Sequence, residues 1–102
     1  MGPIYFNNNA TAFGEQNCAL GGYSTVSGYK NISAGDYSFS EGCYNTALGT
    51  ASHAEGYGSN ATGMLAHAEG SATIASGDYS HAEGLNTIAQ GFCPHIEGRS
   101  SI

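Results

Sequence analysis

Small and large side chains alternate along this chain with a period of two, inside a longer period of seven residues. In the unit 50–56, Ser52 and Ala54 are small, His53 and Glu55 are large or charged, and glycine ends the unit. Alternate residues of a strand point to opposite faces of a sheet. Each unit therefore predicts one short strand with a small-residue face and a large-residue face, and its first two positions predict a turn.

Glycine marks the seven-residue period and excludes two helical alternatives. A coiled coil needs large apolar residues at two positions of each heptad, and a glycine in every heptad would cost about 1 kcal/mol each time. Collagen has a glycine period of three. We expect glycine to close each strand and to permit a positive φ at the corner. The glycines in this frame are Gly14, Gly21, Gly28, Gly35, Gly42, Gly49, Gly56, Gly63, Gly70, Gly77, Gly84, Gly91 and Gly98.

A second period of fourteen overlies the first. S-H-A-E-G or a close relative recurs at 52–56, 66–70, 80–84 and 94–98, and units of another kind lie between these. Two different strands therefore make one coil of fourteen residues. The sequence predicts an all-β protein, a tight parallel β-roll (solenoid) of about seven coils that forms a single domain over 1–102. With about 4.8 Å between stacked strands, the column would be about 34 Å tall.

The composition predicts a thin interior. Alanine is the most frequent of the hydrophobic residues, which make up 40% of the chain, and Trp is absent. If the small faces point inward, two sheets of Ala, Ser and Gly close on each other and the large residues lie outside. An exposed apolar stripe normally marks an interface, so we expect oligomerisation. The predicted stripe consists of Ile4, Phe6, Leu20, Ile32, Leu48, Ile74 and Ile88.

The charge of the chain argues against two classes of partner. The net charge is −6, and Lys30 and Arg99 are the only fixed cations. A nucleic-acid-binding protein or a protein bound to an anionic membrane would need a basic patch. No apolar run approaches the roughly 20 residues of a membrane-spanning helix. We expect neither nucleic-acid binding nor direct membrane insertion. The amino terminus lacks the features of a signal peptide, so we expect a fragment or a protein not exported by that route.

One group of residues could have a chemical function. It consists of His and Glu residues that are two positions apart and lie on the same face of a strand. Stacked imidazoles and carboxylates could bind Zn²⁺ or Ni²⁺. Alternatively, they form a polar ladder, hydrogen-bonded within and between coils or across subunits. The regular repetition favours the ladder, so no metal or cofactor is assigned. The candidates are His53, His67, His81, His95, Glu55, Glu69, Glu83 and Glu97.

Catalysis is not expected. In the pairs Ser52–His53 and Ser80–His81 the two side chains point to opposite strand faces and cannot form a dyad. Asp36 and Asp78 follow glycines and are typical of turns. The odd number of cysteines, three without metal-ligand spacing, predicts neither a disulfide framework nor a zinc site. These cysteines are Cys18, Cys43 and Cys93.

From about Ala10 to Gly98 the pattern resembles the YadA-like head repeat, or haemagglutinin repeat, of trimeric autotransporter adhesins. In that family, units of the form S-V-A-I-G followed by S-x-A-x-G build a left-handed parallel β-roll, and three chains associate around a threefold axis. The resemblance implies this hand and a homotrimer. Here His and Glu replace the Val and Ile of the motif, and such S-H-A-E-G units are similar to repeats in phage tail appendages and Gram-positive surface proteins.

The resemblance also implies a function. We expect a structural or adhesive segment of a trimeric surface fibre, placed at a cell surface or on a virion tail. It would present a binding surface to a host-surface protein or glycan. Two alternatives stay open: a passive spacer in a phage tail appendage, and a metal- or ligand-binding β-solenoid that uses the His/Glu residues.

Overall fold

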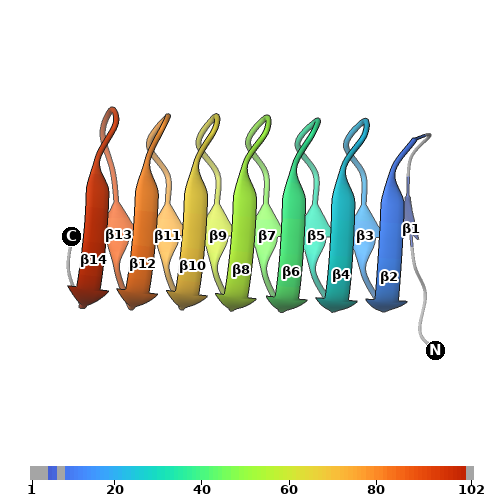
Figure 1. Cartoon of the computed structure of the whole chain (residues 1–102), viewed down its shortest axis with the longest axis horizontal. Coiled ribbons are helices and arrows are strands. Elements are labelled where there is room, and N and C mark those ends of the chain that lie inside the picture. The colour runs from blue at the N-terminus through green and yellow to red at the C-terminus, as the bar shows by residue number, and fades with distance from the viewer. Residues whose placement is uncertain (1–4, 7–8, 101–102) are drawn as a thin grey trace.

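The computed structural model describes residues 5–6 and 9–100, which form two parallel sheets of seven strands each (Figure 1). Successive strands alternate between the sheets, so the chain winds as a β-solenoid with coils of fourteen residues, as predicted. The short sheet contains β1 (Tyr5–Phe6), β3 (Cys18–Ala19), β5 (Ile32–Ser33), β7 (Thr46–Ala47), β9 (Asn60–Ala61), β11 (Ile74–Ala75) and β13 (Ile88–Ala89). The long sheet contains β2 (Thr11–Glu15), β4 (Thr25–Tyr29), β6 (Phe39–Cys43), β8 (His53–Tyr57), β10 (His67–Ser71), β12 (His81–Leu85) and β14 (His95–Arg99).

Strand register places equivalent residues of successive coils directly beside each other. His67, for example, lies between His53 and His81. The stack measures 36 × 22 × 10 Å, which agrees with the predicted height. The register differs at β1, where Phe6 pairs with Ala19, thirteen residues away. The described residues form no helix, and they therefore contain no helix that could span a membrane.

The interior consists of small side chains, as predicted. The alanines at the fifth position of each unit from Ala19 onward are fully buried, and the Ser and Thr residues at the third position are buried as well. A buried methyl group contributes little compared with a buried leucine side chain. Much of the cohesion must therefore come from backbone hydrogen bonds between coils, such as that from His53 N–H to the carbonyl of Ala66 at 2.9 Å.

A row of buried asparagines runs up one side of the interior and was not predicted. Asn17, Asn31 and Asn45 have no exposed surface. The side-chain oxygen of each accepts the backbone N–H one coil further along, at 2.8–3.0 Å. Ser59 and Thr73 continue the row, and the Thr73 hydroxyl donates to Ser59 Oγ at 2.9 Å. Polar side chains thus satisfy buried backbone groups where the chain turns between sheets.

The glycines occupy places other than those predicted. Seven of the thirteen, such as Gly70, lie inside the long strands with φ between 101° and 117°. A second set of glycines follows the short strands. Gly63 belongs to this set and does not have a positive φ. A Cβ atom added to it would lie 2.1 Å from the carbonyl oxygen of Gly77. The corners reach positive φ with residues such as Ala72 (56°), so the expectation of glycine at positive-φ corners is wrong.

The physical reason is the space available to a Cβ atom at each place. At the corner residue Gly58 an added Cβ would meet nothing within 4 Å, and a φ of 67° is within reach of ordinary residues. At Gly70 the Cβ would lie 2.1 Å from the carbonyl oxygen of Gly84, and a φ of 113° suits only glycine. Glycine is therefore needed where successive coils approach each other closely.

The predicted apolar stripe lies on the outer face of the short sheet, but it is interrupted. Leu20, Ile32 and Leu48 are exposed, and Ile74 and Ile88 are half-buried. Thr46 and Asn60 occupy the same register as Ile32 and Ile74, so the middle of the stripe is polar. Ile4 and the side chain of Phe6 lie outside the described residues.

Candidate functional site

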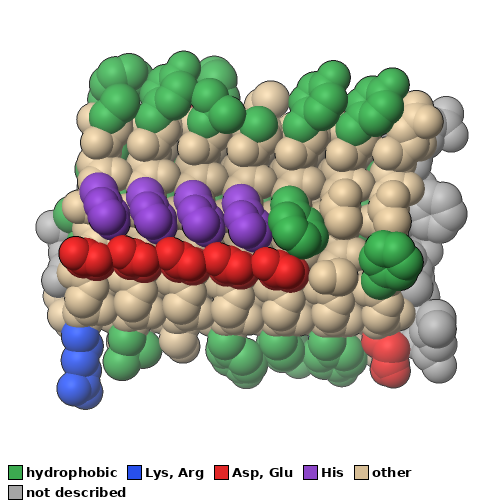
Figure 2. Space-filling model, viewed as in Figure 1, with side chains coloured by type: hydrophobic (Ala, Val, Ile, Leu, Met, Phe, Trp, Pro, Cys, Tyr) green, Lys and Arg blue, Asp and Glu red, His purple; other side chains and the backbone are tan. Residues whose placement is uncertain are grey.

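The predicted His and Glu residues form two adjacent rows on the outer face of the long sheet (Figure 2). They are the first and third residues of β8, β10, β12 and β14. These residues point outward because the residue between them points inward, which is a buried alanine in β8, β10 and β12 and the half-buried Ile96 in β14. All eight candidates are brought together, as predicted. Glu41 of β6 extends the carboxylate row by one coil, and Phe39 does the same for the rings. We call these ten residues the His/Glu ladder.

The four imidazole rings stack face to face. The ring centroids of successive histidines are 4.6–4.7 Å apart, and the ring planes deviate by no more than 6°. The ring of Phe39 stacks on His53 at 4.9 Å and ends the column on that side. The side chains of His53, His67 and His81 are each about one-third exposed, so solvent reaches one edge of the stack.

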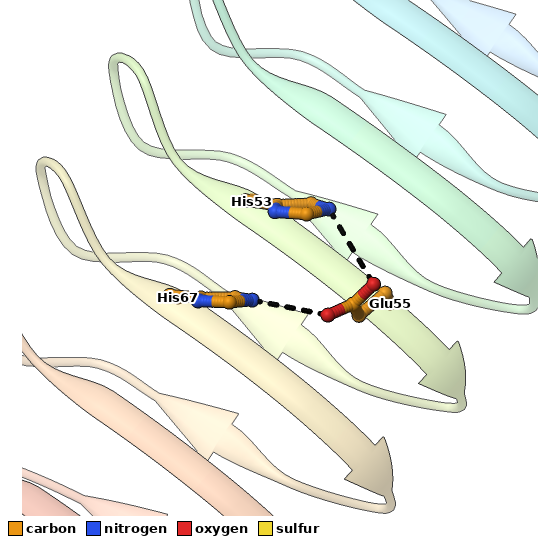
Figure 3. Close-up of side chains that lie close together, drawn as sticks. All are labelled: His53, Glu55 and His67. Carbon is orange, nitrogen blue, oxygen red and sulfur yellow. Dashed lines mark hydrogen bonds and ion pairs between the residues drawn. The ribbon is translucent and has the colours of Figure 1, made fainter.

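Each histidine contacts the glutamate of the preceding coil. The distance from Nε2 to the nearer carboxylate oxygen is 3.3 Å for His67 and Glu55, 3.1 Å for His81 and Glu69, and 3.2 Å for His95 and Glu83. Figure 3 shows Glu55 between His53 and His67, with one carboxylate oxygen directed to each ring. The ladder is therefore tied together across coils as well as along each strand.

Two histidines have a second carboxylate within 4 Å. His53 Nε2 lies 3.4 Å from Glu41 and 3.8 Å from Glu55, and His81 Nε2 lies 3.1 Å from Glu69 and 3.8 Å from Glu83. The Nε2 atom of His53 is buried and makes no hydrogen bond. The Nε2 atoms of His53 and His81 are thus each close to two glutamates, whereas those of His67 and His95 are each close to one.

The carboxylates perturb one another because they are stacked one coil apart. A hydrogen bond between two neighbouring carboxyl groups requires that one of them is protonated. This contact with Glu69 raises the pKa of Glu55, with a smaller contribution from burial, and it raises the pKa of Glu83 too. The same contacts, first with Glu55 and then with Glu83, lower the pKa of Glu69 to about 2. As the pH falls, Glu55 and Glu83 are therefore protonated before Glu69.

The geometry limits how the ladder could hold a metal ion. One Glu and two successive histidines offer ligand atoms within 4.8 Å of each other, beginning with His53, Glu55 and His67. Two zinc ligands can be at most about 4.2 Å apart, since each bond is about 2.1 Å. Rings stacked at 4.6–4.7 Å cannot both bind one ion in this conformation. An ion here would take one imidazole and the carboxylates beside it.

The remaining candidates lie where the sequence placed them. The hydroxyls of Ser52 and Ser80 point inward and donate to the carbonyls of Gly49 and Gly77, away from the neighbouring histidines. Asp36 Oδ1 accepts the backbone N–H of Gly22 at 2.9 Å, which is a turn role. Asp78 makes the equivalent bond with Met64. The three cysteines form no disulfide.

Exposed aromatic and aliphatic side chains form two rims along the corners of the coils, visible at the top and bottom of Figure 2. The sequence analysis did not predict these rims. The rim before the long strands holds Tyr23, Tyr37, Met64, Leu65, Tyr79 and Phe92. The rim after them holds Tyr29, Tyr44, Tyr57 and Leu85. Both rims could have been predicted by grouping the residues by their position in the fourteen-residue coil instead of in the seven-residue unit.

Comparison with known proteins does not add a family or a function. No protein-family model matches the chain, and no curated protein matches it significantly in sequence. The YadA-like resemblance stays a prediction, as do the hand of the coil and the homotrimer.

Proposed function

We propose that the chain is a structural, adhesive β-roll segment of a trimeric surface fibre, and that it presents a binding surface to a host-surface protein or glycan. The observation that carries the proposal is the shape of the coil stack. A rod of 36 × 22 × 10 Å is closed inside by Ala, Ser and Asn, and it places equivalent outer residues of successive coils at the same register. Such a stack holds side chains at fixed spacing, which suits the display of a surface.

The rim before the long strands is the best candidate for the binding surface. Tyr23 and Tyr37 are 60% and 63% exposed, and their rings stack at 5.5 Å with an angle of 5° between the planes. Tyrosine is enriched at interfaces because it offers a large apolar face and a hydroxyl at little cost in conformational entropy. A flat pair of rings suits an extended ligand that lies along the fibre.

The trimer in this proposal uses the stripe on the short sheet. Ile32 and Leu48 expose 36% and 48% of their surface, and both lie on the face opposite to the His/Glu ladder. Burial of these side chains against neighbouring chains removes apolar surface from water. The ladder and the rims then stay accessible on the outside of the fibre, at a cell surface or on a virion tail.

Binding of the fluorescently labelled protein to host cells tests the adhesive role. We expect saturable binding, and treatment of the cells with glycosidase or protease separates a glycan from a protein ligand. The double variant Tyr23→Ser/Tyr37→Ser should lose binding while it keeps the parent's circular dichroism spectrum. Tyr44→Ser/Tyr57→Ser on the opposite rim is the matched control. An absence of saturable binding by the parent would favour the passive spacer instead.

A further inference from the structure

The carboxylate row of the ladder has little positive charge to balance it. Five glutamates stand in one row at the spacing of the coils, and the only fixed cations in the sequence are Lys30 and Arg99. The amino group of Lys30 lies over the rings of Tyr29 and Tyr44. Neutral imidazoles can donate a hydrogen bond to a carboxylate but cannot cancel its charge. The row is therefore suited to attract cations.

The contacts between rings and carboxylates have the spacing of metal ligands. A tetrahedral zinc ion with bonds of about 2.0–2.1 Å holds neighbouring ligand atoms about 3.3 Å apart. In the ladder, each Nε2 lies 3.1–3.4 Å from a carboxylate oxygen of the preceding coil. An ion could enter beside such a pair without movement of the backbone, once the ring carries its proton on Nδ1.

Two of the four rings have a more complete ligand set than the others. His53 and His81 each have two glutamates within 4 Å of Nε2, whereas one glutamate reaches His67 and one reaches His95. We propose that the ladder binds two borderline divalent metal ions such as Zn²⁺, one at His53 with Glu41 and Glu55 and one at His81 with Glu69 and Glu83. Water would complete each coordination sphere.

Alternate occupation follows from charge as well as from geometry. Ions at successive rings would be less than 5 Å apart and would repel strongly, but His53 and His81 are two coils, about 9.5 Å, apart. Two divalent ions also come close to neutralising the five carboxylates. Imidazole together with carboxylate selects borderline ions such as Zn²⁺, Ni²⁺ and Cu²⁺ over Mg²⁺ and Ca²⁺, which prefer oxygen ligands alone.

The ions would be an addition to the fold and not a requirement for it. The interior and the backbone hydrogen bonds between coils involve none of the ladder side chains. Metal binding therefore adds a function to the outer face of the long sheet, independent of the adhesive role and of the rims. A fibre could use it to bridge to a ligand that supplies the remaining coordination position.

Titration calorimetry with ZnCl₂ on the metal-stripped, full-length protein at neutral pH tests the proposal. We expect about two Zn²⁺ ions per chain. The double variant His53→Gln/His81→Gln should weaken binding at least about tenfold, since each site loses its only nitrogen ligand. The matched control His67→Gln/His95→Gln also removes two imidazoles, and it should keep two ions per chain at nearly the parent's affinity.

A second variant keeps the test decisive if the first double variant does not fold. Glu41 contacts one ring of the ladder, His53, so Glu41→Gln should lower the stoichiometry from about two ions to about one. Three results would overturn the proposal: no saturable Zn²⁺ binding by the parent, equal losses in the two double variants, or full stoichiometry in Glu41→Gln. Circular dichroism of each variant separates loss of ligands from loss of fold.

Discussion

The side-chain oxygen of Asn31 accepts a hydrogen bond from the backbone N–H of Asn45, one coil further along, at 2.9 Å. The amide nitrogen of Asn31 donates to the carbonyls of Ser27 and Gly42 at 2.7 and 2.9 Å. One buried side chain thus connects three backbone groups where the chain turns between sheets. In an interior otherwise made of Ala and Ser, such connections carry much of the stability.

Asn31→Ala should therefore lower the free energy of unfolding by about 1–3 kcal/mol for each buried group left without a partner. Asn31→Ser is the control, because the chain itself places Ser59 at this register one coil after Asn45. We expect the serine variant to lose less. Urea denaturation followed by circular dichroism measures both, and an alanine variant as stable as the parent would show that the asparagine row does not stabilise the turn.

Gly70 tests the close approach of successive coils. Gly70→Ala places a Cβ 2.1 Å from the carbonyl oxygen of Gly84 at a φ of 113°, so we expect loss of the folded protein at ambient temperature. Gly58→Ala is the matched control, since its Cβ meets nothing within 4 Å and Ala72 occupies the equivalent corner one coil later. The control should fold. Similar melting temperatures for the two variants would contradict this account of glycine.

His81→Gln tests whether the fold depends on the ladder. The side chain of His81 is one-third exposed, and its polar contacts are with two carboxylates that are themselves partly exposed. Partly exposed pairs of this kind contribute at most about 1 kcal/mol. We expect a loss of that size in urea denaturation with EDTA present, so that bound metal makes no contribution. A loss of several times this amount would mean that the ladder is obligatory for folding.

Glu83→Gln tests the repulsion within the carboxylate row. Contact with Glu69 and then with Glu97 raises the pKa of Glu83 in the folded state. A raised carboxyl pKa means that ionised Glu83 destabilises the fold above that pKa, and that the penalty disappears as the pH falls below the unfolded value. In EDTA, the variant should melt at a higher temperature than the parent at pH 7.5. The two should converge near pH 4, and a variant less stable at pH 7.5 would contradict the sign.

The sequence was sufficient to predict the coil because two periods agree. The alternation of small and large residues defines the inner face, and the fourteen-residue repeat defines the register in which His53 and His67 become neighbours. The ladder followed from the same two periods. Glu41 was missed as a member because Phe39 stands where later coils have histidine.

The corner geometry could not be predicted from residue types. Positive φ falls on residues as different as Lys30, Tyr44 and Ala72, because the corner leaves the Cβ in open space and side chains of very different size fit. The asparagine row could not be predicted from the sequence for a related reason. Asn is common in turns, and only the positions of the neighbouring carbonyls show that Asn17 is buried and hydrogen-bonded.

Light scattering of the purified protein at micromolar concentration tests the trimeric fibre segment most directly. The account predicts a monodisperse particle with three times the mass of the 10.4 kDa chain. Ile32→Ser/Leu48→Ser should reduce that mass, because the serines remove apolar surface from the stripe on the short sheet. A monodisperse particle with the mass of one chain would contradict the account.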